Sequence, residues 1–545
     1  MSRVLVVTGS MISAADPTVS GLLRRQATAL RASSGPWLDI QQKAVHAELL
    51  FARELHLRSR AFRRAPYRAA VERALSPRLD PTDTPELTEV VLLGLLQAEG
   101  LEVETTTYAE LSNDAALRER VLNRHEVVLA STTLLRDLSE ARPLMRMLKT
   151  AKNRVVAGGA LVSTLHSSWP EGEVDLLAVG YGELLVPAIG RWIASGFREL
   201  EAPEGGRLEQ RGATPVLYSG TPQERSLDWL PTPDWGLAAA HHGRSFPLVH
   251  YESVRGCPYR CAFCNYPFLF DDSVFRTKSA ERIARDWLAY AAQGVEVISC
   301  LDSLFTIPTK RLRELCERLI AAGSPLRWIC YARADDLATG DTAELMQRAG
   351  CRVVQIGLES GSQLVLDNMN KRCSVESNAR AIDRCREVGL TTLTTLVVGF
   401  PGETRGTVNE TLDFLRRHPP DFYFAGCFTT RMESMPVLQP ESRARFGLVT
   451  HSDGASSAPY WRHDTMSCAE VPALLREINR TLIEERVSLE GSLFYGAQLE
   501  YRGEDREALL DYQRDLLRRH PLLRLAASGV QRLLNRPLRA AAAGL

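Results

Sequence analysis

The most informative absence in this 545-residue sequence is that of cysteine before position 257. Eleven cysteines follow, an odd number, so the sequence does not predict the disulfide framework of a small secreted protein. In a reducing compartment, cysteines that cluster favour metal binding or catalysis. Three of the eleven do cluster, and the other eight are dispersed along the chain.

Charge of one sign and long apolar runs are lacking too. Lys+Arg and Asp+Glu both number 66, so no global basic field is available to attract nucleic acid. No run of 18 apolar residues is present, so we predict no membrane span. Residues Val4–Val7 are too short an apolar stretch for a signal peptide and favour a first buried strand. We therefore expect a cytoplasmic protein.

The first 200 residues predict a doubly wound α/β domain. Short β-branched runs alternate there with amphipathic stretches, which is typical of a parallel, Rossmann-like sheet. An Arg- and Ala-rich insertion is expected at about residues 11–85. Residues 201–245 are rich in Gly, Pro and Glu and are interpreted as a linker.

Residues 246–435 contain a second alternating pattern. Strands are expected at 250–254, 296–301, 327–331, 353–358, 394–398 and 421–428. Six parallel strands with helices outside predict a partial β/α (TIM-like) barrel, with its active site at the carboxyl ends of the strands. Residues 436–545 are mixed and then mainly helical, and we expect this region to cover the substrate. Its Arg-rich tail, from residue 516, is interpreted as a solvated terminal helix.

The three clustered cysteines directly follow the first of these strands. Cys257, Cys261 and Cys264 have the spacing C-x3-C-x2-C. Three thiolates on one short loop can hold three irons of a [4Fe–4S] cluster, and no fourth Cys is near, so one iron stays open to a chelating ligand. A structural zinc site would require a fourth Cys or His at close spacing, and none follows.

Over residues 246–435 the sequence resembles the radical S-adenosylmethionine (SAM) superfamily. Phe263 matches the aromatic position before the last cluster Cys, and polar or Gly motifs follow each expected strand, although the Gly-Gly-Glu form of one motif is absent. The amino and carboxylate groups of SAM would fill the open iron site. By this resemblance the SAM contacts are Phe263, Asp302, Ser303, Arg333, Glu359, Ser360 and Gly399.

The first domain resembles the cobalamin-binding domain that precedes many radical SAM domains, over residues 85–192. Its strands end in hydroxyl groups or glycines, and glycines at strand ends let a bulky cofactor approach the backbone. By analogy the cobalamin contacts are Ser131, Thr132, Thr133, Gly158, Gly159, Gly180, Tyr181, Gly182 and Glu183.

One cobalamin motif is missing. The Asp-x-His-x-x-Gly sequence that supplies a lower axial His is absent, so we do not expect His to bind the cobalt. The lower face would be open, water-bound or shielded by Arg58, Arg60, Arg63 and Arg64 of the insertion. The lack of cysteine in the first domain also disfavours a methylthiotransferase, a class that carries cluster cysteines there.

The two resemblances together imply a cobalamin-dependent radical SAM methyltransferase. It would transfer a methyl group from SAM through methylcobalamin to an unactivated carbon of a small-molecule or peptide natural-product precursor. Its electron donor would be a flavodoxin or ferredoxin. A radical SAM enzyme of rearrangement, cyclisation or oxidation, with or without cobalamin, is the alternative, and a non-catalytic cobalamin or redox sensor is another. Residues 459–466 mix aromatic and ionisable side chains, a pattern more typical of packing than of a pocket.

Overall fold

The computed structural model describes residues 3–9, 49, 51–79, 81–135, 137–269, 273–430, 434–451, 460–494, 496–520 and 529. They form two compact units. Unit 1 falls within Met1–Ser34, Thr84–Pro258 and Asn265–Arg282, and unit 2 within Gly35–Asp83, Tyr259–Cys264 and Ile283–Leu545. No helix among the described residues is long and apolar enough to cross a membrane.

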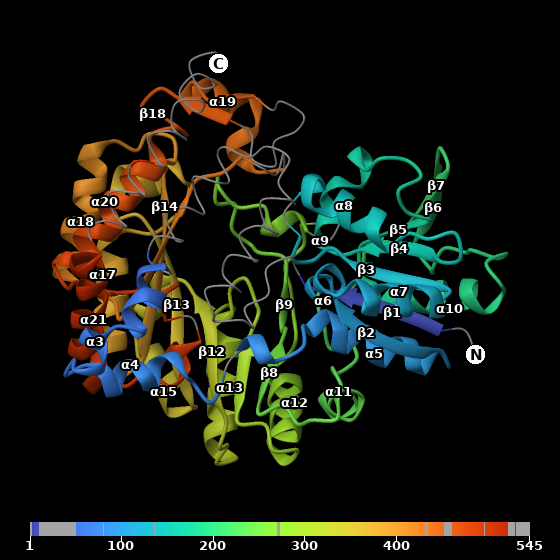
Figure 1. Cartoon of the computed structure of the whole chain (residues 1–545), viewed down its shortest axis with the longest axis horizontal. Coiled ribbons are helices and arrows are strands. Elements are labelled where there is room, and N and C mark those ends of the chain that lie inside the picture. The colour runs from blue at the N-terminus through green and yellow to red at the C-terminus, as the bar shows by residue number, and fades with distance from the viewer. Residues whose placement is uncertain are drawn as a thin grey trace. The chain divides into compact units, whose positions relative to one another are not determined.

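Unit 1 is built on a sheet with the strand order β2-β1-β3-β4-β5-β7-β6 (Figure 1). All neighbouring strands are parallel except β6, which runs antiparallel to β7. Order 2-1-3-4-5 is that of a doubly wound domain, so the predicted fold class is confirmed. The strands are β1 (Arg3–Thr8), β2 (Glu102–Thr107), β3 (Val127–Ser131), β4 (Arg154–Gly158), β5 (Leu176–Val179), β6 (Arg207–Arg211) and β7 (Thr214–Tyr218).

Helices join these strands, and local sequence signals set where they begin. Thr107 and Glu110 form a capping box at the start of α6, and Asp114 and Asp137 accept backbone hydrogen bonds at the starts of α7 and α8. The helices are α5 (Leu87–Ala98), α6 (Tyr108–Asn113), α7 (Ala115–Arg124), α8 (Leu138–Leu148), α9 (Ala160–Leu165), α10 (Gly182–Ala194) and α11 (Trp235–His242). The apolar face of α10 packs with β1, β3, β4 and β5 into one core. Short strands β8 (Leu248–Tyr251), β9 (Val254–Arg255) and β10 (Arg276–Thr277) follow.

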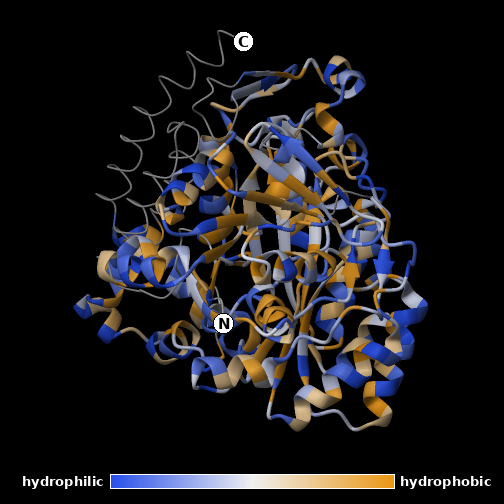
Figure 2. Ribbon diagram, turned by 90° about the vertical axis from the view of Figure 1, so that its right-hand side faces the viewer, coloured by the Kyte–Doolittle hydropathy of each residue, from blue (hydrophilic) through white to orange (hydrophobic). Residues whose placement is uncertain are grey.

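Within unit 2 the strands lie in the order β19-β15-β14-β13-β12-β11. Each pair from β11 to β15 is parallel, as is β15 with β19. The strands are β11 (Val297–Cys300), β12 (Arg327–Ala332), β13 (Cys351–Glu359), β14 (Thr391–Val398), β15 (Phe422–Cys427) and β19 (Leu489–Glu490). The intervening helices are α12 (Ala280–Ala292), α13 (Thr309–Ala321), α14 (Ala334–Leu337), α15 (Thr342–Arg348), α16 (Gln363–Asn368), α17 (Val375–Glu387) and α18 (Arg405–Arg417). The strands are mostly apolar and the helices carry polar faces (Figure 2), as expected of a partial β/α barrel.

The C-terminal region adds a small antiparallel sheet and three helices to unit 2. The sheet comprises β16 (Val449–His451), β17 (Tyr460–His463) and β18 (Met466–Ser467). The helices are α19 (Pro440–Phe446), α20 (Val471–Glu484) and α21 (Arg506–Arg519). Of the predicted tail, residues 521–528 and 530–545 lie outside the described residues, as does residue 459 of the aromatic stretch.

The described part of the predicted insertion belongs to unit 2 and not to the first domain. Helices α3 (Arg60–Arg63) and α4 (Arg68–Leu75) lie beside α21 (Figure 1, blue against red). Phe62, Tyr67 and Val71 share a core with Tyr512 and Phe422. These apolar side chains alternate with many arginines in the sequence. For this reason the amino-acid composition of the stretch did not predict that one face of it packs into a core. Residues 10–48 lie outside the described residues.

The predicted linker also differs from the structure. Residues 207–218 form the β6–β7 hairpin, which extends the sheet of unit 1, and residues 235–242 form α11. Gly212, with φ 51°, makes the turn between the two strands. The Gly- and Pro-rich composition of this stretch reflects its turns, while β7 is apolar and buried.

Candidate functional site

The part of the cysteine loop that belongs to unit 2, Tyr259–Cys264, is fixed through its backbone. The Ala262 amide donates to the Met369 carbonyl at 2.7 Å, and the Ala262 carbonyl accepts from the Val437 amide at 2.9 Å. The Cys264 amide donates to the Cys261 carbonyl at 3.1 Å. These bonds hold the segment between Cys261 and Cys264 in a compact turn, beside the residues that follow α16.

A buried cation lies next to this turn. Lys371 donates to the Glu359 carboxylate at 2.8 Å, and its ammonium lies 5.7 Å from the centre of the Phe263 ring. Burial lowers the pKa of Lys371, but the Glu359 carboxylate and the nearby Cys261 thiol outweigh it, so the pKa is raised overall. The sequence interpretation named Glu359 and missed Lys371. The signal was a single Lys in a loop after α16, which pattern alone does not distinguish from a surface residue.

Glu359 has an unusual backbone with φ 63°, a strained conformation for a residue other than Gly. Gly357 makes room for its pair with Lys371. A Cβ on Gly357 would lie 2.6 Å from Glu359 Oε1 and 2.8 Å from Lys371 Nζ. The positive φ of Glu359 and the absence of a side chain at Gly357 therefore place this ion pair at the carboxyl end of β13.

Arg333, directly after β12, also binds the segment that contains Lys371. Its guanidinium donates to Asp335 at 2.7 Å and to the carbonyls of Lys371 and Arg372 at 2.7 and 2.9 Å. It also lies 3.9 Å from the centre of the Tyr259 ring. Arg333 is thus a positioning residue here, since the chain's own groups accept several of its hydrogen bonds.

The loop after β14 is clamped at Gly399. The Glu403 carboxylate accepts a hydrogen bond from the Gly399 amide, and His463 of β17 donates to the Gly399 carbonyl at 3.2 Å. Burial raises the pKa of Glu403 to about 7, partly offset by the Gly399 amide, and burial lowers that of His463. A Cβ on Gly399, where φ is 91°, would lie 2.4 Å from Val471. This position therefore requires Gly.

The remaining predicted SAM contacts lie at strand ends, where Asp302 and Ser360 are buried and Ser303 is half-buried. Asp302 and Ser303 follow β11, and Asp302 is 1% exposed. The Ser360 hydroxyl, after β13, interacts with Thr411 at 3.2 Å and accepts from the Ser362 amide at 3.1 Å. Ser360 therefore shapes the start of α16.

The carboxyl ends of the strands also expose apolar side chains. Leu301, directly after β11, and Tyr331, near the end of β12, are 42% and 40% exposed, and Phe424 within β15 is 39% exposed. Apolar side chains exposed singly are common on protein surfaces, and the sequence interpretation had singled out neither Leu301 nor Tyr331 for its exposure.

The donor set fits a [4Fe–4S] cluster in chemistry and in spacing. Cys257 and Cys264 are half-buried and Cys261 is buried. In the part of the chain that the structure describes, no three His, Cys, Asp or Glu side chains stand together as a preformed metal site.

The predicted cobalamin residues of unit 1 come together at the carboxyl ends of β3, β4 and β5. The Thr132 amide and hydroxyl both donate to the Gly158 carbonyl, at 2.7 and 2.8 Å. A Cβ on Gly159 would lie 2.8 Å from Thr133 Oγ1, and one on Gly180 would lie 2.3 Å from Ser219 Oγ. These glycines allow adjacent loops to pack closely, which is a structural role beside any contact with a cofactor. Ser131 is buried at the end of β3.

Two of the predicted contacts are occupied by the protein itself. Both carboxylate oxygens of Glu183 accept from Arg255, at 2.6 and 3.0 Å, and both side chains are less than a tenth exposed. The Tyr181 ring is buried, and its hydroxyl accepts from Arg276 at 3.1 Å. Glu183 and Tyr181 therefore hold the loop after β5 in place.

Open surface remains next to them. Apart from the chain neighbours and the backbone of α10, no atom of the described residues lies within 4 Å of the point where a Cβ of Gly182 would stand, at the start of α10. Thr133 is exposed, and Leu134 beside it is 52% exposed. A hydroxyl, an exposed Leu and a bare backbone at one sheet edge fit a large, flat and partly apolar ligand such as a corrin. Leu134 is a further residue that the sequence interpretation missed.

Comparison with known proteins identifies the family. The profile of the radical SAM superfamily matches residues 251–415. A ribosomal protein uS12 methylthiotransferase RimO of Pelotomaculum thermopropionicum is 32% identical over 380 residues, which cover 64% of this chain and 75% of the relative. The chain belongs to the radical SAM superfamily. Membership carries with it SAM and a [4Fe–4S] cluster, so these two predicted cofactors are confirmed.

Other relatives differ in reaction. An uncharacterized methyltransferase of Pyrococcus horikoshii is 27% identical over 258 residues, covering 46% of this chain and 54% of the relative. An anaerobic magnesium-protoporphyrin IX monomethyl ester cyclase of Rubrivivax gelatinosus is 27% identical over 336 residues, covering 57% and 58%. The present chain thus spans about half the length of these two curated relatives.

A solved structure shares the fold of nearly the whole chain. The radical SAM methyltransferase TsrM of Kitasatospora setae, solved with tryptophan substrate and a SAM analogue, superposes with a TM-score of 0.62 at 16% identity. The superposition covers 83% of this chain and 97% of TsrM. It supports the architecture of both units.

Proposed function

We propose that this radical SAM enzyme is a cobalamin-dependent methyltransferase that methylates an unactivated carbon of a small-molecule or peptide precursor. The observation that carries the proposal is the open edge at Thr133, Leu134 and Gly182, at the strand ends of a doubly wound sheet in the same chain as the cysteine loop. TsrM, whose fold this chain shares, has been solved with cobalamin and a [4Fe–4S] cluster bound.

The chain's own residues would divide the work as follows. Cys257, Cys261 and Cys264 would hold the cluster, which supplies the electron for SAM cleavage. Lys371 offers the one ammonium beside Cys261 and Phe263 that the described residues place there, and so would meet the carboxylate of SAM. Arg333 and Gly399 would fix the two loops that border this position.

Cobalamin, where bound, supplies a methyl carrier. The residues proposed to receive it are Ser131, Thr132 and Thr133 after β3, Gly158 and Gly159 after β4, and Gly180 and Gly182 after β5. Leu134 would add apolar contact area. Glu183 and Tyr181 would act indirectly, through their bonds to Arg255 and Arg276.

The first test is cofactor content after anaerobic purification with cobalamin supplied. We expect about four irons per chain, as a [4Fe–4S] cluster requires, together with stoichiometric cobalamin. Cys261→Ala should lose the iron. Cys316→Ala is the matched control, because Cys316 is equally buried but lies in α13. Wild-type protein without a cluster after reconstitution would contradict the site, and a cluster without cobalamin would contradict the methyltransferase proposal alone.

The reaction type is tested by the mass of the product. A gain of one methylene equivalent supports methyl transfer, and SAM cleavage without that gain supports rearrangement, cyclisation or oxidation. The second reaction type is kept because one relative is named as a cyclase. A non-catalytic sensor would bind SAM without cleaving it under reducing conditions.

A further inference from the structure

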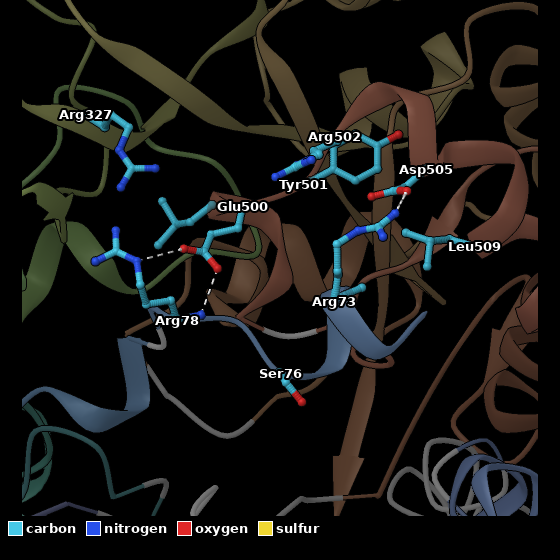
Figure 3. A pocket seen from close by; sticks show the side chains of 11 residues that line it. Arg73, Ser76, Arg78, Arg327, Glu500, Tyr501, Arg502, Asp505 and Leu509 are labelled. Atoms are coloured by element: carbon cyan, nitrogen blue, oxygen red, sulfur yellow. Dashed lines mark hydrogen bonds and ion pairs between the residues drawn. The ribbon is translucent and has the colours of Figure 1, made fainter. Parts of the chain in front are cut away.

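A cavity of about 440 Å³ lies in unit 2, away from the cysteine loop. Three segments that are distant in sequence line it: residues 73–78, the start of β12 at Arg327, and residues 499–509 (Figure 3). Arg327 is the first residue of β12, whereas Arg333 follows its last. Because the rise along a strand is about 3.3 Å per residue, the cavity lies roughly 20 Å from the carboxyl edge that carries the radical SAM site.

Four arginines line this cavity and only two carboxylates do. They are Arg73, Arg78, Arg327 and Arg502, against Glu500 and Asp505. The lining residues alone therefore carry two positive charges in excess. Two carboxylates outside the lining balance them, since Glu296, directly before β11, pairs with Arg78 and Arg327, and Glu504 pairs with Arg502.

Two of the four guanidinium groups have most of their donors unused. Among the described residues, the Arg327 guanidinium makes one hydrogen bond, at 3.3 Å to Glu296, and the Arg502 guanidinium makes one ion pair, at 3.6 Å with exposed Glu504. A guanidinium carries five N–H donors in a planar fork. In Figure 3 Arg327 reaches in from one side and Arg502 from another, with Arg78 and Arg73 below them.

The rest of the lining is apolar or hydroxylic. Leu499, Leu509 and the Tyr501 ring provide the apolar surface, and Ser76 a hydroxyl. We propose that this cavity binds a phosphorylated small molecule, with its phosphate between Arg327 and Arg502 and its body against Tyr501 and Leu509. The planar fork of Arg matches the geometry of phosphate oxygens, and the cavity volume lies in the range of small-molecule sites.

Bound there, the ligand connects α4, β12 and the segment before α21. Helices α4 and α21 share a core, and Arg78, which follows α4, pairs with Glu296 before β11. Binding therefore raises the thermal stability of unit 2 by mass action. The site is separate from SAM cleavage and takes its ligand with or without a cluster.

Phenyl phosphate, inorganic phosphate and benzoate are titrated calorimetrically into the full chain, without SAM or reductant and at constant ionic strength. We expect saturable binding, tightest for phenyl phosphate because its ring packs on Tyr501. Arg327→Gln and Arg502→Gln should each weaken it about tenfold. Arg405→Gln, an exposed arginine of α18 that pairs with Glu477, is the matched control and should bind as wild type does.

The proposal fails if neither phosphate binds saturably, or if benzoate binds as tightly as phenyl phosphate. It fails equally if both variants bind like wild type. Arg502→Gln keeps the measurement decisive should Arg327→Gln fold poorly, because Arg502 is 63% exposed and contacts only Glu504. Because neither SAM nor the cluster takes part, the result is independent of the methyltransferase proposal.

Discussion

Gly357 shows how one missing side chain sets up a charged pair. We predict that Gly357→Ala forces Glu359 and Lys371 apart, because the new Cβ would lie within 3 Å of both. Separating a buried ion pair leaves each charge uncompensated. SAM cleavage should fall by at least about tenfold while iron content stays unchanged, since about 1.4 kcal/mol corresponds to that factor.

Gly426→Ala on β15 is the control for this change. A Cβ there would lie 3.7 Å from the Phe424 ring and 4.0 Å from the Leu396 carbonyl, both ordinary contact distances. Equal rates of 5′-deoxyadenosine release from the two variants would show that the Glu359–Lys371 pair does not matter for cleavage.

Glu403 makes a pH-dependent contribution to stability. Burial raises its folded-state pKa to about 7, against 4.5 for the unfolded chain. Its contribution is thus fully present below pH 4.5 and is lost as pH rises through 7, by an amount on the order of 3 kcal/mol. Glu403→Gln keeps the acceptor for the Gly399 amide without the titration. The variant should therefore lose less stability than wild type between pH 6 and pH 8.5 in thermal unfolding, and parallel curves would contradict this.

Among the elements, the loop between β5 and α10 depends on the Arg255–Glu183 pair. Burial raises the pKa of Glu183, but Arg255 more than offsets it, so the carboxylate is charged. Glu183→Ala removes one of the two carboxylates that pair with the buried guanidinium and should cost on the order of 3–5 kcal/mol. Glu209→Ala removes an exposed partner of Arg207 and should cost far less, because solvent screens that pair. Urea unfolding of the two variants distinguishes a structural Glu183 from one that acts on cobalamin only.

Helices α3 and α4 belong to the core that α21 completes. Phe62→Ala should cost on the order of 3–5 kcal/mol, because the ring is buried against Tyr67 and Tyr512. Leu55→Ala, at a position 48% exposed, should change stability by about 0.5 kcal/mol or less. If both variants unfold alike, residues 49–79 contribute no core to unit 2.

The elements also show what sequence patterns can predict. Apart from β6, β7 and β19, the strands of both sheets were predicted to within a few residues, because β-branched runs between helices leave a strong periodic signal. The β6–β7 hairpin and helices α3 and α4 were missed, since turn residues and arginines dominate their composition. In the site, motifs predict the residues at strand ends, but Lys371 and Leu134 become visible only once the chain has folded. The predicted cofactor contacts stay predictions until they are tested.

At the scale of the whole molecule, each unit has its own core, so the two cofactors should load separately. Gly182→Trp fills the open surface of α10 and should abolish cobalamin binding while leaving iron content unchanged. Gly94→Trp is its control, as a helical Gly of unit 1 with equally open surroundings. If Gly182→Trp still binds cobalamin, the proposed corrin site at Gly182 is wrong.

The fold also sorts the eleven thiols by reactivity. Six cysteines beyond the cluster loop are buried, and burial raises the pKa of Cys316 and Cys385 to about 12, so these thiols stay protonated. Only Cys257, Cys264, Cys373 and Cys427 are partly accessible. Two of these four would be covered by iron. An alkylating reagent applied to the native protein therefore becomes a gauge of cluster occupancy, since each loaded molecule would withhold the same two sites from modification.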